Sequence, residues 1–215
     1  TIGRIEGKSL DFVGSGAEQT FVGPEGDSGI DSDFVFCFMV LTEGLTTRVR
    51  DITFENVRNY GFRIEGAGRG EFEDCVFRGS GGAFLGRLAD GGWFRRCQFV
   101  DLNNEIPAHA IALTSPTHDV EISDCSVNDV FIGIGSYWGQ TDGIVIQNSE
   151  INGGHTGVQF ADGASGEVRN CLITNMEGYG VVGNSSGTVI IEGNTIEMPD
   201  VGHLNYCVNA YYPPG

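Results

Sequence analysis

The sequence predicts an all-β solenoid, a right-handed parallel β-helix of about seven coils, and two observations support this prediction. First, a short phrase recurs with a period of about 22 residues: an apolar residue, a polar residue, Asn or Asp, and then Cys or another small residue. Second, each phrase is followed by another short apolar stretch, usually after a glycine. A coil of this length cannot bury its own inner face, so successive coils must stack edge to edge.

The recurring phrase defines columns of equivalent residues along the solenoid. Its apolar residue faces the core and its polar residue faces outward, because side chains alternate along a strand. Its Asn or Asp occupies the corner after the strand, where the left-handed backbone conformation is tolerated. The instances are Phe54-Glu55-Asn56-Val57, Phe72-Glu73-Asp74-Cys75, Phe94-Arg95-Arg96-Cys97, Ile122-Ser123-Asp124-Cys125, Ile146-Gln147-Asn148-Ser149, Val168-Arg169-Asn170-Cys171 and Ile191-Glu192-Gly193-Asn194.

The second apolar stretches are also of strand length and alternate with period two. No stretch keeps a helical period for ten residues. We therefore expect a single domain over residues 1–215, with N-terminal coils or a cap over 1–48, regular coils over 49–198 and a C-terminal extension over 199–215. The second stretches are Gly61-Phe62-Arg63-Ile64, Ala83-Phe84-Leu85, Ala110-Ile111-Ala112-Leu113, Ile132-Gly133-Ile134, Gly157-Val158-Gln159-Phe160 and Gly180-Val181-Val182.

The charge balance restricts the partners of this chain. Twelve basic and 29 acidic residues give a net charge of −17, which repels nucleic acid and anionic membrane surfaces. No apolar run approaches the ~20 residues that span a bilayer. The chain starts at Thr1 without Met, which fits export and signal removal or an excised segment. We expect an extracellular or cell-surface location and a polysaccharide or other glycan ligand, with an oligomer left open.

Four of the six cysteines occupy the same repeat position, so Cys75, Cys97, Cys125 and Cys171 should form a column. Stacked cysteines of this kind favour a role as small apolar core residues. Disulfides between neighbouring coils, such as Cys75–Cys97 or Cys97–Cys125, stay open because the Cα spacing allows them. No C-x-x-C spacing is present, so a thiolate zinc site is not expected. No cofactor is expected either, although the acidic loop Asp27–Asp33 offers oxygen ligands for Ca²⁺ without a recognised calcium-loop spacing.

The repeat resembles the pectate-lyase-like superfamily of parallel β-helix proteins over about residues 49–198. That resemblance implies polysaccharide lyases, polygalacturonase-type hydrolases, uronate epimerases or phage tailspikes. Gln140-Thr141-Asp142-Gly143 looks like the polygalacturonase N-T-D-G segment, but the paired aspartates that should follow are replaced by Gly154-His155-Thr156. Pro116-Thr117-His118-Asp119 approaches the epimerase D-P-H-D motif without matching it. Both segments also fit ordinary polar turns.

Chemistry-bearing residues gather around the second strand of each coil. His109 and His155 fall just before that strand, Tyr137 follows it, and Arg63 points outward from it. Histidine exchanges protons near neutral pH and tyrosine can act as an acid. The candidate catalytic residues are therefore His109, His155, Tyr137 and Arg63, with Arg63 near a substrate carboxylate. The alternative is that these are ordinary turn and loop residues.

Two classes of function remain open at this point, and the sequence leaves uncertain whether the protein is an enzyme. The first is an extracellular carbohydrate-associated β-helix that acts as a polysaccharide lyase or uronate epimerase. The second is a non-catalytic surface, adhesion or structural module that binds glycans, or a fragment of a trimeric spike. The missing catalytic motifs favour the second, and the grouping of His, Tyr and Arg favours the first.

Overall fold

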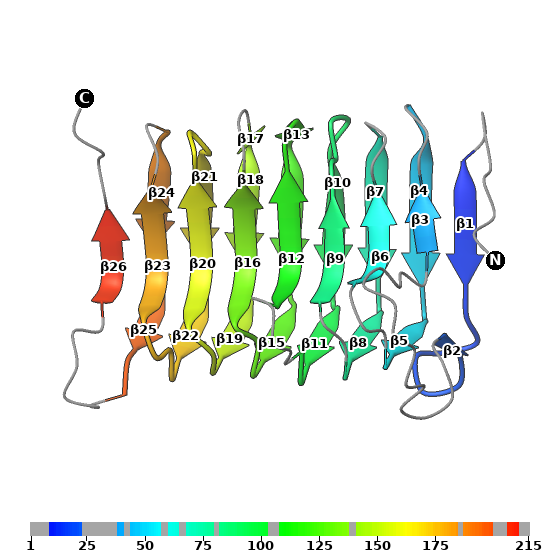
Figure 1. Ribbon diagram of the computed structural model, residues 1–215, viewed down its shortest axis with the longest axis horizontal. Helices are drawn as coiled ribbons and strands as arrows, with labels where there is room; N and C mark the ends of the chain where they lie inside the picture. The colour runs from blue at the N-terminus through cyan, green and yellow to red at the C-terminus, as the bar shows by residue number, and fades with distance from the viewer. Residues whose placement is uncertain are drawn as a thin grey trace, which may run out of the picture.

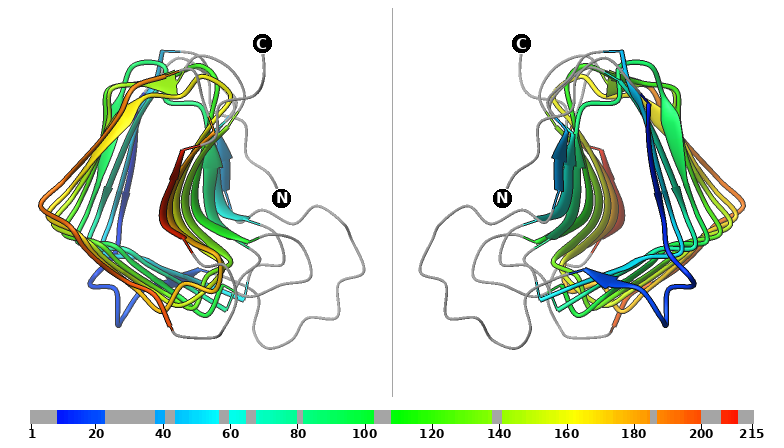
Figure 2. Two further views of the ribbon diagram at one scale, coloured as in Figure 1. Left: turned by 90° about the vertical axis from the view of Figure 1, so that its left-hand side faces the viewer. Right: turned by 90° about the vertical axis from the view of Figure 1, so that its right-hand side faces the viewer.

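The computed structural model describes residues 9–22, 38–40, 44–56, 60–64, 68–79, 82–102, 108–137, 141–184, 187–199 and 206–210. Three eight-stranded parallel sheets run the length of the molecule, and no helix occurs in these ranges. Figure 1 shows strands of successive coils side by side from β1 to β26, and the end-on views in Figure 2 show each coil turning through the three sheets. The predicted parallel β-helix is confirmed.

Sheets A and B follow one another in each coil and are separated by a single corner. Sheet A contains β1 (Leu10–Val13), β4 (Thr46–Arg50), β7 (Arg69–Glu73), β10 (Gly92–Arg95), β14 (Val120–Ser123), β18 (Ile144–Gln147), β21 (Gly166–Arg169) and β24 (Val189–Glu192). Sheet B contains β2 (Phe21–Val22), β5 (Thr53–Glu55), β8 (Val76–Arg78), β11 (Gln98–Val100), β15 (Ser126–Asn128), β19 (Glu150–Asn152), β22 (Leu172–Thr174) and β25 (Thr195–Glu197).

Sheet C is formed by the second apolar stretches of the sequence and completes each coil. It contains β3 (Phe38–Val40), β6 (Tyr60–Ile64), β9 (Gly82–Gly86), β12 (His109–Thr114), β16 (Ile132–Tyr137), β20 (Thr156–Ala161), β23 (Tyr179–Asn184) and β26 (Tyr206–Ala210). A small fourth sheet pairs β13 (Thr117–His118) with β17 (Thr141–Asp142) at the corner between sheets C and A. Because β26 pairs with β23, part of the expected C-terminal extension supplies the last strand of sheet C.

The corner between sheets A and B has the conformation expected for the recurring phrase. Its residues have positive φ in coil after coil, at Asp51, Asp74, Arg96, Asp124, Asn148, Asn170 and Gly193. A second corner after sheet B repeats this geometry at Asn56, Gly79, Asp101, Asp129, Gly153 and Asn175. Asn and Asp tolerate this region better than other non-glycine residues, which explains their recurrence.

The first copy of the phrase was placed one strand too late in the sequence. Phe72 pairs with Val49 in sheet A, whereas Phe54 pairs with Phe77 in sheet B. The sheet A equivalent in that coil is therefore Val49-Arg50-Asp51, and Phe54-Glu55-Asn56 belongs to the next corner. The two corners look alike in sequence because each follows an inward apolar residue and an outward charged one.

The core is a set of stacked aromatic and aliphatic columns. In the N-terminal half, Phe72 and Phe94 stack with ring centroids 4.7 Å apart, and Phe54 stacks on Phe77 at 4.8 Å. All four rings are fully buried. Towards the C-terminus the same positions hold Ile and Val, which fill the coil with β-branched side chains suited to strands.

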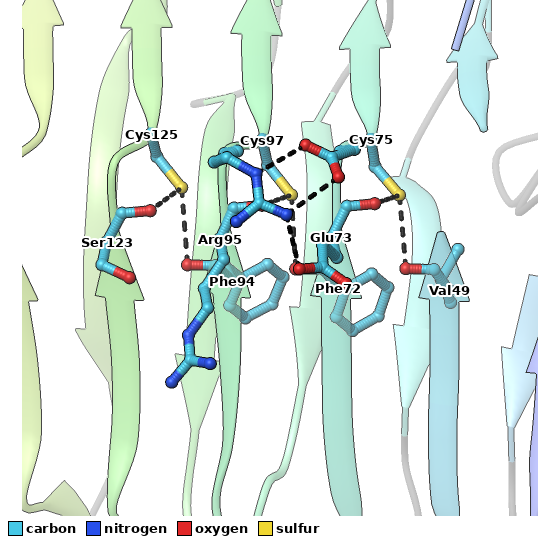
Figure 3. A network of polar contacts seen from close by, with 11 residues as sticks. Val49, Phe72, Glu73, Cys75, Phe94, Arg95, Cys97, Ser123 and Cys125 are labelled. Atoms are coloured by element: carbon cyan, nitrogen blue, oxygen red, sulfur yellow. Dashed lines mark hydrogen bonds and ion pairs between the residues drawn. The ribbon is translucent and has the colours of Figure 1, made fainter. Parts of the chain in front are cut away.

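The predicted cysteine column lies inside the corner between sheets A and B. Cys75, Cys97, Cys125 and Cys171 are buried free thiols. Figure 3 shows Cys75 and Cys97 in adjacent coils, each pointing at a carbonyl of the preceding coil. The Cys75 thiol donates to the Val49 carbonyl at 3.5 Å and that of Cys97 to Phe72 at 3.6 Å. These thiols therefore act as small core side chains that also bond to the backbone. Cys37 lies outside the described residues.

Candidate functional site

A row of polar side chains crosses the outward face of sheet C. Tyr60, His109, Tyr137 and Gln159 come from β6, β12, β16 and β20. The Nε2 atom of His109 lies 2.8 Å from the Tyr137 hydroxyl, which donates to Oε1 of Gln159 at 3.1 Å. The Tyr60 hydroxyl makes a longer contact of 3.5 Å with Nδ1 of His109. The row joins residues 99 positions apart in the chain, from 60 to 159, on one face.

The bonds in this row can all point in one direction. A tyrosine hydroxyl has a single hydrogen, so if Tyr137 donates to Gln159, it must accept from His109. His109 then carries its hydrogen on Nε2, and its Nδ1 lone pair faces the Tyr60 hydroxyl. In this arrangement each group donates to the next, from Tyr60 through His109 and Tyr137 to Gln159. Such a chain can move a proton along the face.

Two glycines make room for the tyrosine rings. A Cβ atom on Gly135 would lie 2.7 Å from the Tyr137 hydroxyl oxygen and 2.9 Å from Cζ, so the ring lies flat along its own strand. A Cβ on Gly82 would lie 2.5 Å from Cε1 of Tyr60. The missing side chains at these positions therefore bring both hydroxyls to His109.

Burial keeps the two tyrosines in their neutral form. Burial raises the pKa of Tyr137 well above its usual range, and the neighbouring Tyr60 raises it further. The pKa of Tyr60 is also raised by burial, and the nearby charge of Arg63 opposes this in part. Both hydroxyls consequently remain hydrogen-bond donors at neutral pH.

Two arginines lie beside the row, Arg63 in β6 and Arg87 directly after β9. Arg63 projects outward from β6, and the backbone amide of Arg87 bonds to the carbonyl of Ile64 in that strand at 3.0 Å. Burial lowers the pKa of Arg63, and the positive charge of Arg87 lowers it further. Two cations this close on so acidic a chain favour an anionic ligand.

Most arginines elsewhere are neutralised by the protein itself. Arg87 is exposed and has no ion pair within the described ranges, and the same holds for Arg50 at the end of β4. Six arginines on the outward faces of sheets A and B, in contrast, pair with carboxylates of the same or neighbouring coils. These are Arg48, Arg69, Arg78, Arg95, Arg96 and Arg169.

His155 lies in a neighbouring aromatic cluster. Its ring stacks on Phe131 with centroids 5.1 Å apart and meets Tyr179 edge to face at 5.8 Å. Its Nδ1 atom lies 3.0 Å from the Thr156 hydroxyl. The structure therefore brings His109 and Tyr137 together directly, with Arg63 on the same face, and places the His155 ring among other partners. Trp138 and the insertion Asn103–Pro107 lie outside the described residues.

A second polar pair lies at the corner between sheets C and A. His118 and Asp142 are register partners in β13 and β17, and Nδ1 of His118 is 2.5 Å from Oδ1 of Asp142. The two side chains come from the two motif remnants of the sequence. Along the chain, each remnant alone fits an ordinary polar turn. A spacing of 24 residues, close to one coil, was the signal that could have joined them.

The described residues contain no group of three or more His, Cys, Asp or Glu side chains that could hold a metal ion. The acidic loop Asp27–Asp33, which offered Ca²⁺ ligands, lies outside them. Within the same ranges no helix is long and apolar enough to cross a membrane.

Comparison with known proteins supports the fold and says little about activity. No curated protein matches this sequence significantly. Among solved structures, the catalytic domain of a GH87 α-1,3-glucanase in complex with tetrasaccharides matches with a TM-score of 0.31 and 10% identity. The match covers 95% of this chain and 60% of that one, so this chain spans about three fifths of its length. A family model described as a right-handed β-helix region matches residues 38–196. The chain therefore belongs to the right-handed β-helix family.

Proposed function

We propose that this protein is an extracellular carbohydrate-active β-helix that acts on a uronate-containing glycan as a lyase or epimerase. The reacting face is the outward surface of sheet C. His109 and Tyr137 exchange protons with the sugar, and Arg63 binds its carboxylate. His155, in the adjacent cluster, lines the same side of the solenoid.

One observation carries this proposal: the 2.8 Å hydrogen bond between His109 and Tyr137 on the sheet that also bears Arg63, with Arg87 directly after β9. A proton next to a carboxylate becomes acidic when a cation neutralises that carboxylate, which is the contribution of the two arginines. A base must then remove the proton, and Nδ1 of His109, whose contact with the Tyr60 hydroxyl is the long one of 3.5 Å, supplies it. Tyr137 stays protonated because burial raises its pKa, so its hydroxyl can turn from Gln159 and donate to the departing oxygen.

A second candidate function is non-catalytic glycan binding. The four side chains of the row bond to one another, and such a satisfied network can also serve to rigidify a surface. On this account the arginines hold an anionic sugar and no proton moves. The two candidates differ in one measurable respect, which is the formation of product.

The experiment incubates the protein with alginate, pectate and glycosaminoglycans. New ultraviolet absorbance from an unsaturated product indicates elimination, and a changed ratio of uronate epimers by NMR indicates epimerisation. Tyr137→Phe and His109→Gln should each lower turnover by about 100-fold or more, the usual contribution of general acid–base catalysis. Tyr206→Phe, which removes a hydroxyl in the last coil, should leave turnover unchanged. Binding without product in every polymer would favour the non-catalytic module.

A further inference from the structure

The His118–Asp142 pair has the geometry of an oriented imidazole. Asp142 lies one coil beyond His118, and its carboxylate holds Nδ1 at 2.5 Å. A carboxylate in this position accepts the Nδ1 hydrogen and thereby leaves a lone pair on Nε2. The side chains of His118 and Asp142 are 35% and 61% exposed, so the pair faces solvent.

Buried neighbours anchor the pair on both strands. Thr117 and Thr141, the residues just before His118 and Asp142, point inward and are almost fully buried. The hydroxyl of Thr117 donates to the Thr114 carbonyl at 2.6 Å and accepts from the Leu88 amide at 3.1 Å. Thr117 is held by these bonds and Thr141 by burial alone, its hydroxyl having no hydrogen-bond partner among the described residues. The parallel pairing of β13 with β17 keeps the two outward side chains in register.

In the part of the chain that the structure describes, no side-chain nucleophile accompanies this imidazole. Within the described ranges, the polar side-chain contact of His118 is the one to Asp142, and no Ser, Thr or Cys side chain bonds to its Nε2. An imidazole that is oriented by a carboxylate and open to solvent can bind a water molecule at Nε2 and take its proton. The attacking group on this corner is therefore water.

We propose that His118 and Asp142 form a hydrolytic dyad in which His118 is the general base that activates water against a carboxylic ester. Nε2 takes a proton from water while the water oxygen bonds to the ester carbonyl carbon. The tetrahedral intermediate then breaks its bond to the alkoxy oxygen, and the imidazolium returns the proton to that oxygen. The products are a carboxylic acid and an alcohol, and no further reactant is needed.

The surrounding charge selects the class of ester. Asp119 and Asp90 are exposed. Asp119 follows His118 directly, and the amides of Gly91 and His118 both bond to the Leu88 carbonyl, in the turn that contains Asp90. With Asp142 these carboxylates outnumber the one nearby cation among the described residues, Arg87, which precedes Leu88. Phosphate and sulfate esters are repelled by such a field. A neutral carboxylic ester, such as an acyl group on a sugar hydroxyl, is therefore the expected substrate.

The test measures hydrolysis of p-nitrophenyl acetate by the whole protein, with p-nitrophenyl phosphate as the anionic counterpart. His118→Gln should lower the rate on the acetate by about 100-fold, the lower end of general-base contributions. Asp142→Asn should lower it as well, because an amide can donate to Nδ1 and so stabilise the wrong tautomer. The rate should fall in heavy water, since the proton moves in the slow step, and the phosphate should not be hydrolysed.

Asp162→Asn serves as the matched control. It neutralises another exposed corner aspartate with positive φ. It should keep the wild-type rate. If His118→Gln hydrolyses the acetate as fast as wild type, or if heavy water has no effect, the dyad is not a general base. Because the assay contains no uronate, its outcome is independent of the proposed chemistry at His109 and Tyr137.

Discussion

Substitution of Gly135 by Ala should destabilise the protein only because Tyr137 is present. Gly135 lies in β16, outside the positive-φ region, so an alanine there meets no backbone strain. The three atoms nearest to the new Cβ all belong to the outer part of the Tyr137 ring. The ring must therefore move away from the sheet, and its hydroxyl leaves both His109 and Gln159.

The size of the effect follows from what the ring loses. Two hydrogen bonds contribute about 1–3 kcal/mol together. Replacing Gly by Ala returns about 0.4–1 kcal/mol by restricting the unfolded chain. The net loss in the free energy of unfolding should lie between about 0 and 2.6 kcal/mol, with a midpoint of about 1.3 kcal/mol. When Tyr137 is first replaced by Ala, no hydrogen bonds are lost and only the restriction of the unfolded chain remains. Gly135→Ala should then stabilise the protein.

The assay is urea unfolding of the four proteins of this double-mutant cycle, followed by circular dichroism. Gly183→Ala is the matched control in sheet C, because the nearest atom to its Cβ is Cγ2 of Val189 at an ordinary 3.7 Å. It should be neutral or stabilising in both backgrounds. If Gly135→Ala costs the same with and without the Tyr137 side chain, the ring does not lie over Gly135 and the proposed row is wrong.

Three further predictions concern the coil. Phe94→Ala should cost about 3–5 kcal/mol in urea unfolding, because its fully buried ring stacks on Phe72. Gly154→Ala should destabilise more than Gly135→Ala, because its φ is 100° and its Cβ would overlap the rigid carbonyl oxygen of Val130. Burial raises the pKa of the Cys97 thiol well above its usual value. The stabilisation that depends on the neutral thiol is therefore complete below the unfolded-state pKa of about 8.5, and it is lost progressively as the pH rises above that value. The unfolding free energy should then fall by about 1.4 kcal/mol more per pH unit in wild type than in Cys97→Ala, and native Cys97 should resist thiol reagents.

The sequence predicted the repeating coil better than it predicted which residues of neighbouring coils pair with one another. Columns of inward and outward residues follow from period-two alternation, and the sheet A positions from Phe72 onward were placed correctly. The first coil was misplaced because Val49-Arg50-Asp51 and Phe54-Glu55-Asn56 obey the same local rule. Each ends in a corner residue with positive φ. Local pattern cannot distinguish two corners with the same backbone geometry, and only the pairing partners in the next coil can.

The candidate site was predicted in part, for a physical reason. His109 and Tyr137 were grouped because both flank the second strand of adjacent coils, and the structure joins them at 2.8 Å. Tyr60 was missed because it reaches His109 across an intervening coil, over the bare backbone of Gly82. A contact of this kind depends on the absence of a side chain, which leaves no chemical signal in the sequence.

The solenoid converts spacing in the sequence into proximity in space, and this explains why motif comparison failed at His118 and Asp142. Each motif remnant was tested against a pattern along the chain, where its expected neighbours are missing. The partner of His118 lies 24 residues later, and the partner of His109 lies 28 residues later because Tyr137 follows Ile132, the register partner of His109, at the far end of β16. In a β-helix the informative comparison is therefore between residues one coil apart. A reactive pair can be complete there even when neither motif is complete along the chain.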